Sequence, residues 1–578
     1  MKRNLNLILV WGIALVLGGF LFNYSTYLAA MRIYQVDECE NVFMARILAA
    51  GQTAHYFSYV SPLQFVLAWL ARGATQSADL FASARCFLLL VFWVNLLLLG
   101  LATGERLLSR RILVALAGAA TLAPLWDYGF EIRADNLLLT GLLLFWCVAR
   151  NASARPLSCI IAGAIAVALQ FVTFKAFVYT LPLSFLILVF PRANQVARWK
   201  LVLAWSTGAL GMFLLMRLVY GAAGWWPLYL SDVRRVFTDA TGDNRFGAGA
   251  TLQRLLTQTP LLVAMVFAGL ITVTVDFWRR GRAALAWEGW LPETLLLAVA
   301  FAALMLNPAP YAYNLLNLVP FAFLFVYRYA SLFLKGTWAT PGLRPLMVSV
   351  LVFAHLVPFV IATRRHLDWT SQRQVHLMQL AERLTDPVND PVYDGIGMVP
   401  TRSSINYHWF LHSLVMRNFT TGAWPSVRDM LAARPAAVII PSYRTDWLPE
   451  PDHEFIRDRY VPVSDDFWVL GKVLPEGGGT FEIYHPGRYR IATLEGSDLA
   501  GTYPAGLAGL LKPQIEGTVT GTLDGRSLTN RPVALAVGTH RIECAPGCRP
   551  TVVWVGPKSD RVERQGDENH LRLFSNWY

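Results

Sequence analysis

The feature that most constrains the fold is a series of long apolar runs in the first 363 residues of the chain. The first begins near Leu7 and ends near Met31. Ten more follow at about 83–103, 112–126, 135–149, 156–174, 176–191, 200–220, 258–277, 290–306, 314–331 and 345–362. A helix needs about 20 apolar residues to cross a bilayer core. The pattern therefore predicts an α-helical polytopic protein of about 11 spans, with the lipid bilayer as its surroundings.

The composition agrees with this class. Of the 578 residues, 55% are apolar and only 15% are charged, which is typical of membrane proteins. The formal net charge is +12, a value that can indicate nucleic-acid binding. Much of this excess, however, lies in short loops between the apolar runs, where membrane orientation explains it better. We therefore expect no nucleic-acid partner.

The basic residues between the runs predict the orientation. Lys2 and Arg3 precede the first run, and basic residues follow every even-numbered run. These are Arg106, Arg110, Arg111, Arg150, Arg155, Arg192, Arg198, Lys200, Arg279, Arg280, Arg282, Arg328, Lys335 and Arg344. Basic loops remain cytoplasmic. We therefore expect a bacterial inner-membrane protein with a cytoplasmic N-terminus, and with the odd-numbered span exits and the C-terminal domains in the periplasm.

The chain after residue 363 has the composition of a soluble protein. Helical patterns at 372–384 and 426–433 and strand patterns at 391–395 and 436–440 indicate a small α/β unit. Short alternating runs separated by turns follow Gly477 and predict a β-sandwich. We expect three domains: a transmembrane domain at 1–363, a periplasmic α/β domain at 364–476 and a periplasmic β-sandwich at 477–578. The last two are either acceptor-recognition or purely structural modules.

Ionisable residues gather at the predicted periplasmic ends of the spans. Asp37, Glu38 and Arg46 follow the first run, in a segment at 37–50 that has the apolar pattern of an interfacial helix. Charges at a membrane edge are costly and are therefore candidates for function. The alternative is that Asp37 and Glu38 cap this helix and face water.

Further polar residues lie on the same predicted side. Glu131, Arg133 and Asp135 follow the third run, and Lys175 stands alone between the fifth and sixth. A lone lysine there either extends to the lipid head groups or binds an anion. Its position against the positive-inside bias favours anion binding. A turn at 307–314, rich in Pro and Tyr, precedes the tenth run and is otherwise an ordinary turn with interfacial tyrosines.

In this order, the motifs resemble the external loops of GT-C glycosyltransferases, and most of all the bacterial branch with the protein O-mannosyltransferases and the aminoarabinose transferase of lipid A. The resemblance covers roughly residues 1–363. It rests on Asp37-Glu38 with Ser61-Pro62 downstream, the segment 131–135, Lys175, and the segment 310–314 with Pro320. The first loop departs from the pattern because it has no lysine and only one histidine, His55. The sequence therefore does not decide whether a divalent metal is needed, and we assign no metal ligand.

The resemblance implies an inverting transfer of a sugar from a polyprenyl-phosphate donor to a hydroxyl of a periplasmic lipid, glycan or protein. Asp37 is then the expected base, and Glu38 orients it or binds the sugar. Lys175, Arg133 and Arg46 are the expected ligands of the donor phosphate.

The remaining candidates have alternative roles. Glu131 and Asp135 bind sugar hydroxyls or hold Arg133, and a purely structural ion pair is equally compatible with the sequence. Tyr311 and Tyr313 are expected to line the sugar or acceptor site. His55 belongs to the same expected site or packs the first loop.

Two other classes of protein remain open. A transporter or flippase for a lipid-linked or anionic substrate would use Asp37, Arg133 and Lys175 as a conduction path. The predicted one-sided position of these charges and the absence of an inverted repeat in the sequence argue against it. A non-catalytic membrane scaffold that presents the β-domain would leave the charged motifs unexplained.

Overall fold

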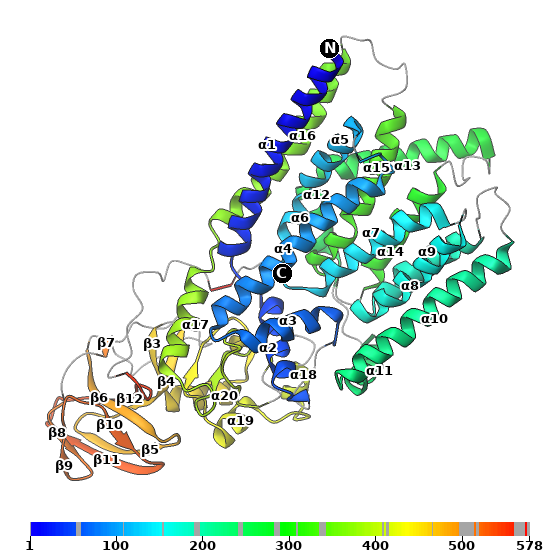
Figure 1. Ribbon diagram of the computed structural model, residues 1–578. Helices are drawn as coiled ribbons and strands as arrows, with labels where there is room; N and C mark the ends of the chain where they lie inside the picture. Colours follow the sequence, from blue (N-terminus) through cyan, green and yellow to red (C-terminus); the bar gives the residue numbers. More distant parts are fainter. Residues whose placement is uncertain are drawn as a thin grey trace.

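The computed structural model describes residues 2–53, 59–107, 109–152, 155–189, 197–240, 247–281, 290–307, 310–333, 343–406, 410–411, 416–464, 466–495, 514–515, 519–559 and 573–574. A bundle of helices forms the N-terminal part, and a domain built on β-sheets lies at one end of it (Figure 1). The two parts correspond to the chain before and after the last apolar run.

Each of the apolar runs lies on helical structure. The first run is α1 (Lys2–Met31). The others contain α4 (Ser77–Ala102), α5 (Arg110–Ala120), α6 (Ala123–Tyr128), α7 (Ala134–Ala152), α8 (Pro156–Val172), α9 (Ala176–Val189), α10 (Arg198–Ala222), α13 (Pro260–Arg280), α14 (Leu291–Leu306), η3 (Ala312–Asn317), α15 (Val319–Phe333) and α16 (Leu343–Arg364). Two runs are interrupted. The third divides into α5 and α6, and the tenth divides into a 3-10 turn, η3, and α15. In both cases a proline occupies the first turn of the second helix, where its missing N–H has no helical partner to lose.

Five helical segments of the described chain are long and apolar enough to cross a membrane. They are Ala14–Met31, Ser77–Ala102, Arg198–Ala222, Pro260–Arg280 and Ser349–Leu367. Shorter apolar helices accompany them, including α8 and α14. Large apolar side chains such as Leu15, Phe213 and Phe353 are exposed on the outside of this bundle. Lipid covers such surfaces at no cost, so the helical part is a membrane-associated domain.

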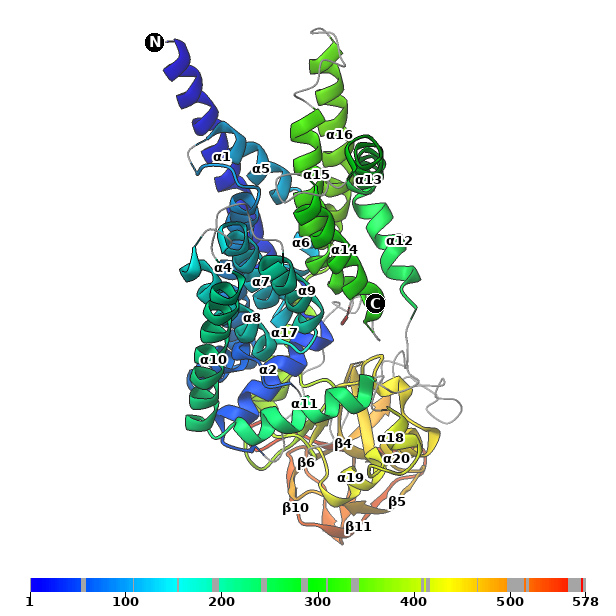
Figure 2. The same cartoon turned by 90° about the vertical axis from the view of Figure 1, so that its right-hand side faces the viewer.

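The segment after α1 forms α2 (Val36–Ala49), which confirms the helix predicted at 37–50. It does not lie on the surface, however. Nine of its residues are buried, because α3 (Pro62–Gly73) and α4 pack against it. In Figure 2, α2 lies at the end of the bundle that faces the C-terminal part. Two more helices, α11 (Trp226–Ala240) and α12 (Gly249–Gln258), separate α10 from α13.

The C-terminal part begins with α17 (Gln372–Leu384), which matches the predicted helix. The main sheet has the order β1-β2-β4-β12-β6-β10, with β3 paired to β4 and β7 paired to β6. Its strands are β1 (Val392–Tyr393), β2 (Val438–Ile439), β3 (Tyr460–Ser464), β4 (Phe467–Val473), β6 (Gly487–Glu495), β7 (Gln514–Ile515), β10 (Val533–Leu535) and β12 (Pro550–Trp554). Short helices α18 (Met416–Thr420), α19 (Val427–Ala433), η5 (Thr445–Trp447) and α20 (Glu450–Arg459) connect its first strands.

This sheet crosses the boundary predicted between the α/β unit and the β-sandwich. β4 precedes residue 476, yet it pairs with β12, and Thr551 lies opposite Val473. The two units predicted at 364–476 and 477–578 are therefore joined through one continuous sheet. The sequence could not reveal this, because strand pairing over about 80 residues leaves no local pattern.

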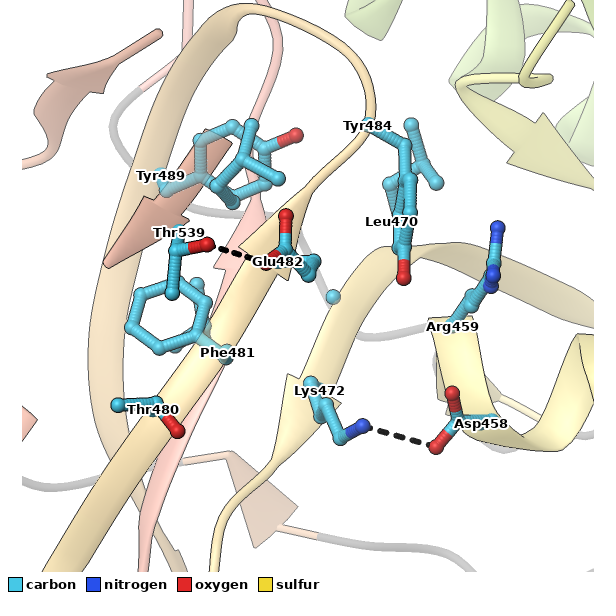
Figure 3. Close-up of a pocket in the computed structure, with 13 residues that line it drawn as sticks. Asp458, Arg459, Leu470, Lys472, Thr480, Phe481, Glu482, Tyr484, Tyr489 and Thr539 are labelled. Atoms are coloured by element: carbon cyan, nitrogen blue, oxygen red, sulfur yellow. Dashed lines mark hydrogen bonds and ion pairs between the residues drawn. The ribbon is translucent and has the colours of Figure 1, made fainter. Parts of the chain in front are cut away.

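A second, four-stranded sheet lies in the same part of the chain, so the C-terminal part is a β-sheet region as predicted. The order of the second sheet is β5 (Gly478–Ile483), β11 (Gly538–Cys544), β8 (Gly521–Leu523) and β9 (Arg526–Ser527). A cleft of about 140 Å³ is lined by Lys472 of the main sheet and by Phe481 and Thr539 of the second (Figure 3). Glu482 accepts a hydrogen bond from Thr539, and Lys472 pairs with Asp458 at 2.8 Å. Four of the polar side chains of this cleft thus pair with one another.

Backbone and side-chain hydrogen bonds attach the C-terminal part to the start of α2. The Gln374 amide of α17 donates to the Tyr34 carbonyl at 2.9 Å, and its oxygen accepts from the Tyr34 N–H at 2.7 Å. Arg32 forms a β-bridge with Thr370. The residues that lead into α2 are therefore fixed by both halves of the chain.

Candidate functional site

Four of the predicted site residues meet at the end of the bundle. Arg133 precedes α7, and its guanidinium forms ion pairs with Asp37 of α2 and, at 3.4 Å, with Asp135 in the first turn of α7. Lys175, in the break between α8 and α9, forms an ion pair with the same Asp135. The four alternate in sign, so a chain of contacts runs from Asp37 through Arg133 and Asp135 to Lys175. We call these residues the charged cluster.

The 3-10 turn η3 adds an aromatic and an amide group to the charged cluster. The Tyr313 ring lies under the Arg133 guanidinium, whose central carbon is 3.5 Å from the ring centroid, and the Lys175 ammonium is 5.2 Å from the same centroid. Such contacts stabilise cations by about 0.5–2 kcal/mol. Lys175 also donates to the Asn314 side-chain oxygen at 3.2 Å. The tyrosine-rich turn thus holds both cations in place.

Access to solvent differs along the charged cluster. The side chains of Asp37 and Lys175 are 21% and 29% exposed to solvent, whereas those of Arg133 and Asp135 are 8% and 9% exposed. The two ends of the cluster can therefore contact a ligand, while the two middle residues are held within the protein. One end supplies a carboxylate and the other an ammonium.

Glu38 lies beneath the charged cluster and has a structural role. Its carboxylate accepts two hydrogen bonds from Arg85 of α4, at 2.9 and 2.7 Å, and neither side chain has any exposure. Burial raises the pKa of Glu38, but Arg85 and Arg32 outweigh this effect and bring its pKa below the ordinary value. The enclosed position excludes the predicted contact between Glu38 and a sugar in this conformation.

α2 also positions the loop that carries Arg133. The Ile132 N–H donates to Glu38 at 3.1 Å, and the Asn41 amide donates to the Ile132 carbonyl at 3.1 Å. Both ends of this peptide unit are therefore fixed to the helix that bears Asp37. The contact between Asp37 and Arg133 follows from this attachment.

The Glu131 carboxylate pairs with Arg32 and not with the Arg133 guanidinium, although the Glu131 carbonyl accepts a hydrogen bond from the Arg133 N–H at 2.8 Å. Glu131 is 2% exposed, and a guanidinium nitrogen of Arg32 is 3.2 Å from one of its carboxylate oxygens. The other oxygen has no hydrogen-bond donor in the described chain. Burial raises the pKa of Glu131 to about 8, because the charge of Arg32 only partly offsets the loss of solvent. The Asp135 carboxylate, by contrast, pairs with the Arg133 guanidinium, which is one of the roles predicted for it.

A second buried carboxylate lies beside this pair. Asp127 of α6 accepts hydrogen bonds from Gln258 at 2.6 Å, Arg365 at 2.9 Å and His366 at 2.7 Å. Asp127 thus ties α6 to α12 and to the end of α16.

The remaining predicted residues lie apart from the charged cluster or outside the described chain. Arg46 is in the last turn of α2, about 13 Å along the helix axis from Asp37, and donates to the Ala71 carbonyl of α3. The structure therefore places Arg46 apart from the charged cluster, and its role in binding the donor phosphate stays a prediction. The Tyr311 ring is 5.9 Å from that of Tyr313, at the edge of the site. His55 falls outside the described residues. Within the described chain no group of His, Cys, Asp and Glu side chains could hold a metal ion.

Arg32, Arg85 and Asn314 contact residues of the site, and none of the three is predicted from the sequence. Arg32 and Arg85 each stand at the edge of an apolar run on the side that the positive-inside rule leaves poor in basic residues. That exception is the sequence signal that distinguishes Arg32 and Arg85, as it does Lys175. No comparable signal exists for Asn314, because a single asparagine in a turn is ordinary.

No protein-family description matches this chain, and no curated protein sequence is significantly similar to it. The fold and the site therefore define only a class: a membrane-associated helical protein with a C-terminal β-sheet domain and a charged, partly accessible cluster at the junction of the two.

Proposed function

We propose that the protein is an inverting GT-C-type glycosyltransferase that moves a sugar from a polyprenyl-phosphate donor to a periplasmic hydroxyl acceptor. The observation that carries this proposal is the charged cluster, in which a partly exposed carboxylate and a partly exposed ammonium are linked through Arg133. All eleven apolar runs cross the bacterial inner membrane in this proposal. The cluster then lies at the periplasmic surface, together with the C-terminal part.

The proposed reaction is a single displacement. The acceptor oxygen attacks the anomeric carbon and forms the new glycosidic bond, while the bond between that carbon and the phosphate oxygen breaks. Asp37 takes the acceptor proton. The electron pair of the broken bond leaves with the polyprenyl phosphate, whose growing charge Lys175 and Arg133 stabilise. Attack from the face opposite the leaving group inverts the anomeric centre.

The two ends of the cluster suit these two tasks. Lys175 is the most exposed cation of the cluster, and Tyr313 and Asn314 orient it. Arg133 is better buried and presents a planar guanidinium, which binds phosphate oxygens with defined geometry. A phosphate at this position would compete with Asp135 for both cations.

The test is sugar transfer by the purified full-length protein, given a panel of polyprenyl-phosphate sugars and extracted cell-envelope acceptors. We expect sugar attached to an acceptor and an equal amount of released polyprenyl phosphate. Lys175→Ala should lower kcat/KM about 10- to 100-fold, the value of a charge-assisted hydrogen bond. Lys200→Ala is the matched control, because Lys200 is exposed in the first turn of α10.

Two results would contradict the proposal. One is a folded, monodisperse protein that consumes no donor with any acceptor. The other is movement of an unmodified lipid-linked sugar across vesicles that contain the protein, since this would indicate a transporter.

A further inference from the structure

One edge of the main sheet, at the carboxyl ends of β1 and β2, faces α2. Ligands bind at the corresponding edge in many α/β proteins. β1 and β2 are parallel, with Val392 opposite Val438, so the loops that follow them leave the same edge. The loop after β2, residues 441–447, is the second part of this edge and is called the 441–447 loop below.

Electrostatic interactions link this edge to α2, the helix that bears Asp37. Burial raises the pKa of Cys39 on α2, and among the charges the largest addition to this effect comes from Asp394, which directly follows β1. Burial also raises the pKa of Tyr443 in the 441–447 loop; Arg444 opposes this effect, and the charges of Asp37 and Cys39 add to it. Both loops are therefore within range of the helix that bears Asp37.

The 441–447 loop has a fixed shape. The Ser442 N–H donates to the Thr445 hydroxyl at 2.9 Å, and that hydroxyl donates to the Ser442 carbonyl at 2.6 Å. The Arg444 N–H donates to the Ser442 hydroxyl at 3.2 Å. His453 of α20 contacts the Thr445 carbonyl at 2.9 Å. A loop held in this way presents its long side chains without a large cost in conformational entropy.

Arg444 is a buried cation without a carboxylate partner among the described residues. It is 7% exposed, its Nε donates to the Tyr443 hydroxyl at 3.2 Å, and its guanidinium lies 4.3 Å from the Trp447 ring centroid. One terminal nitrogen, Nη1, is buried and has no acceptor in the described chain. Uncompensated buried charges are costly.

Other buried arginines of the chain differ in this respect. Arg32, Arg85 and Arg133 are similarly buried, and each contacts a carboxylate. Arg444 instead has two aromatic side chains and an unused donor. Its charge is therefore available for an anion supplied by a ligand.

We propose that Arg444, with Tyr443 beside it, forms an anion-binding subsite that the C-terminal part adds to the charged cluster, and that it takes a phosphate or carboxylate group of a substrate. The assignment of that group to a substrate rests on the function proposed above. The protein then has two cationic regions that face α2, Lys175 on the bundle and Arg444 next to Tyr443 on the 441–447 loop. The anion belongs either to the acceptor or to the donor lipid.

The test uses inorganic phosphate as the probe and the full-length protein in nanodiscs, at constant ionic strength. Binding is measured as the phosphate-dependent rise of the thermal midpoint, which follows from ligand linkage. We expect Lys175→Ala to retain a phosphate response, and we expect the apparent Kd for phosphate to be at least about tenfold higher in Lys175→Ala/Arg444→Gln. Arg526→Gln is the matched control, because Arg526 is exposed in β9.

Arg444→Lys keeps the charge and provides the test if Arg444→Gln does not fold. Its phosphate affinity should fall, because an ammonium lacks the planar donor pair of a guanidinium. An unchanged phosphate response in both Arg444 variants would overturn the proposal. The measurement contains no sugar donor, so its outcome is independent of whether the protein transfers sugar.

Addition of a polyprenyl monophosphate distinguishes the two sources of the anion. If the Arg444-dependent response persists when this lipid is saturating, the subsite takes the acceptor. If the lipid removes the response, the subsite takes the phosphate of the donor.

Discussion

Arg133 and Asp37 are 96 residues apart in the chain, and the guanidinium of one contacts the carboxylate of the other. The contact depends on α2, which contributes Asp37 directly and also binds the peptide unit that precedes Arg133 through Glu38 and Asn41. One helix therefore controls both the carboxylate and the cation of the site. Changes that loosen this helix should impair stability and function together.

The first prediction concerns the pair beneath the site. Glu38→Gln leaves the charge of Arg85 buried without compensation, and both side chains are fully enclosed. We expect a loss of about 3–5 kcal/mol in the free energy of unfolding, seen as a marked fall in the thermal midpoint of the solubilised protein. Arg72→Met on α3 is the control, because Arg72 is exposed and its loss should change little.

The double variant Glu38→Met/Arg85→Met separates stability from function. Two apolar side chains can replace a buried ion pair without loss of stability, so the midpoint should recover in part; the Gln35 and Ile132 N–H groups still lose their acceptor. Sugar transfer should not recover, because the Ile132 N–H loses its acceptor and the Arg133 loop is no longer fixed. Full transfer by this double variant would contradict the positioning role of Glu38.

The second prediction concerns the ring under Arg133. Tyr313→Phe keeps the aromatic face that the guanidinium contacts at 3.5 Å, whereas Tyr313→Leu removes it. We expect Tyr313→Phe to be nearly unchanged and Tyr313→Leu to raise the KM for the donor roughly 2- to 30-fold. Steady-state kinetics at varied donor concentration give the comparison. Equal effects of the two substitutions would argue for a role of the phenol hydroxyl instead.

The third prediction is a pH dependence that arises from Glu131. Burial raises its pKa from 4.5 to about 8, so between these values the folded state keeps a proton that the unfolded state has lost. The contribution of Glu131 to stability therefore falls as the pH rises through this window. Glu131→Gln lacks this titration, and its thermal midpoint relative to wild type should increase from about pH 5 to about pH 8.

Glu476→Gln is the control for this measurement. Glu476 is an exposed carboxylate in the turn before β5, so its substitution should change the midpoint little. A constant difference between Glu131→Gln and wild type over the same range would show that Glu131 is ionised in the folded protein.

The sequence predicted the helices well because apolar runs and their boundaries are local signals. It also assigned Asp37, Arg133, Asp135 and Lys175 to one side of the membrane, and the structure brings these four side chains together. The basis was the alternation of basic loops, which requires no knowledge of the packing.

Features that depend on side-chain packing could not be predicted in this way. Glu38 and Asp37 are neighbours in the sequence, but a helix turns by 100° per residue, and only the packing of α4 decides which of the two is buried against Arg85. The position of Arg444 is a stronger example. It depends on which edge of the β1–β2 pair faces α2, and nothing in the local sequence specifies this.

The most direct test of the account is sugar transfer by Asp37→Asn, compared with wild type and with Asp79→Asn, which changes an exposed carboxylate in the first turn of α4. If Asp37 is the base, Asp37→Asn should lose about 10²- to 10⁴-fold in kcat while it elutes as a folded, monodisperse protein, and Asp79→Asn should retain activity. Full transfer by a folded Asp37→Asn variant would contradict the assignment of the site.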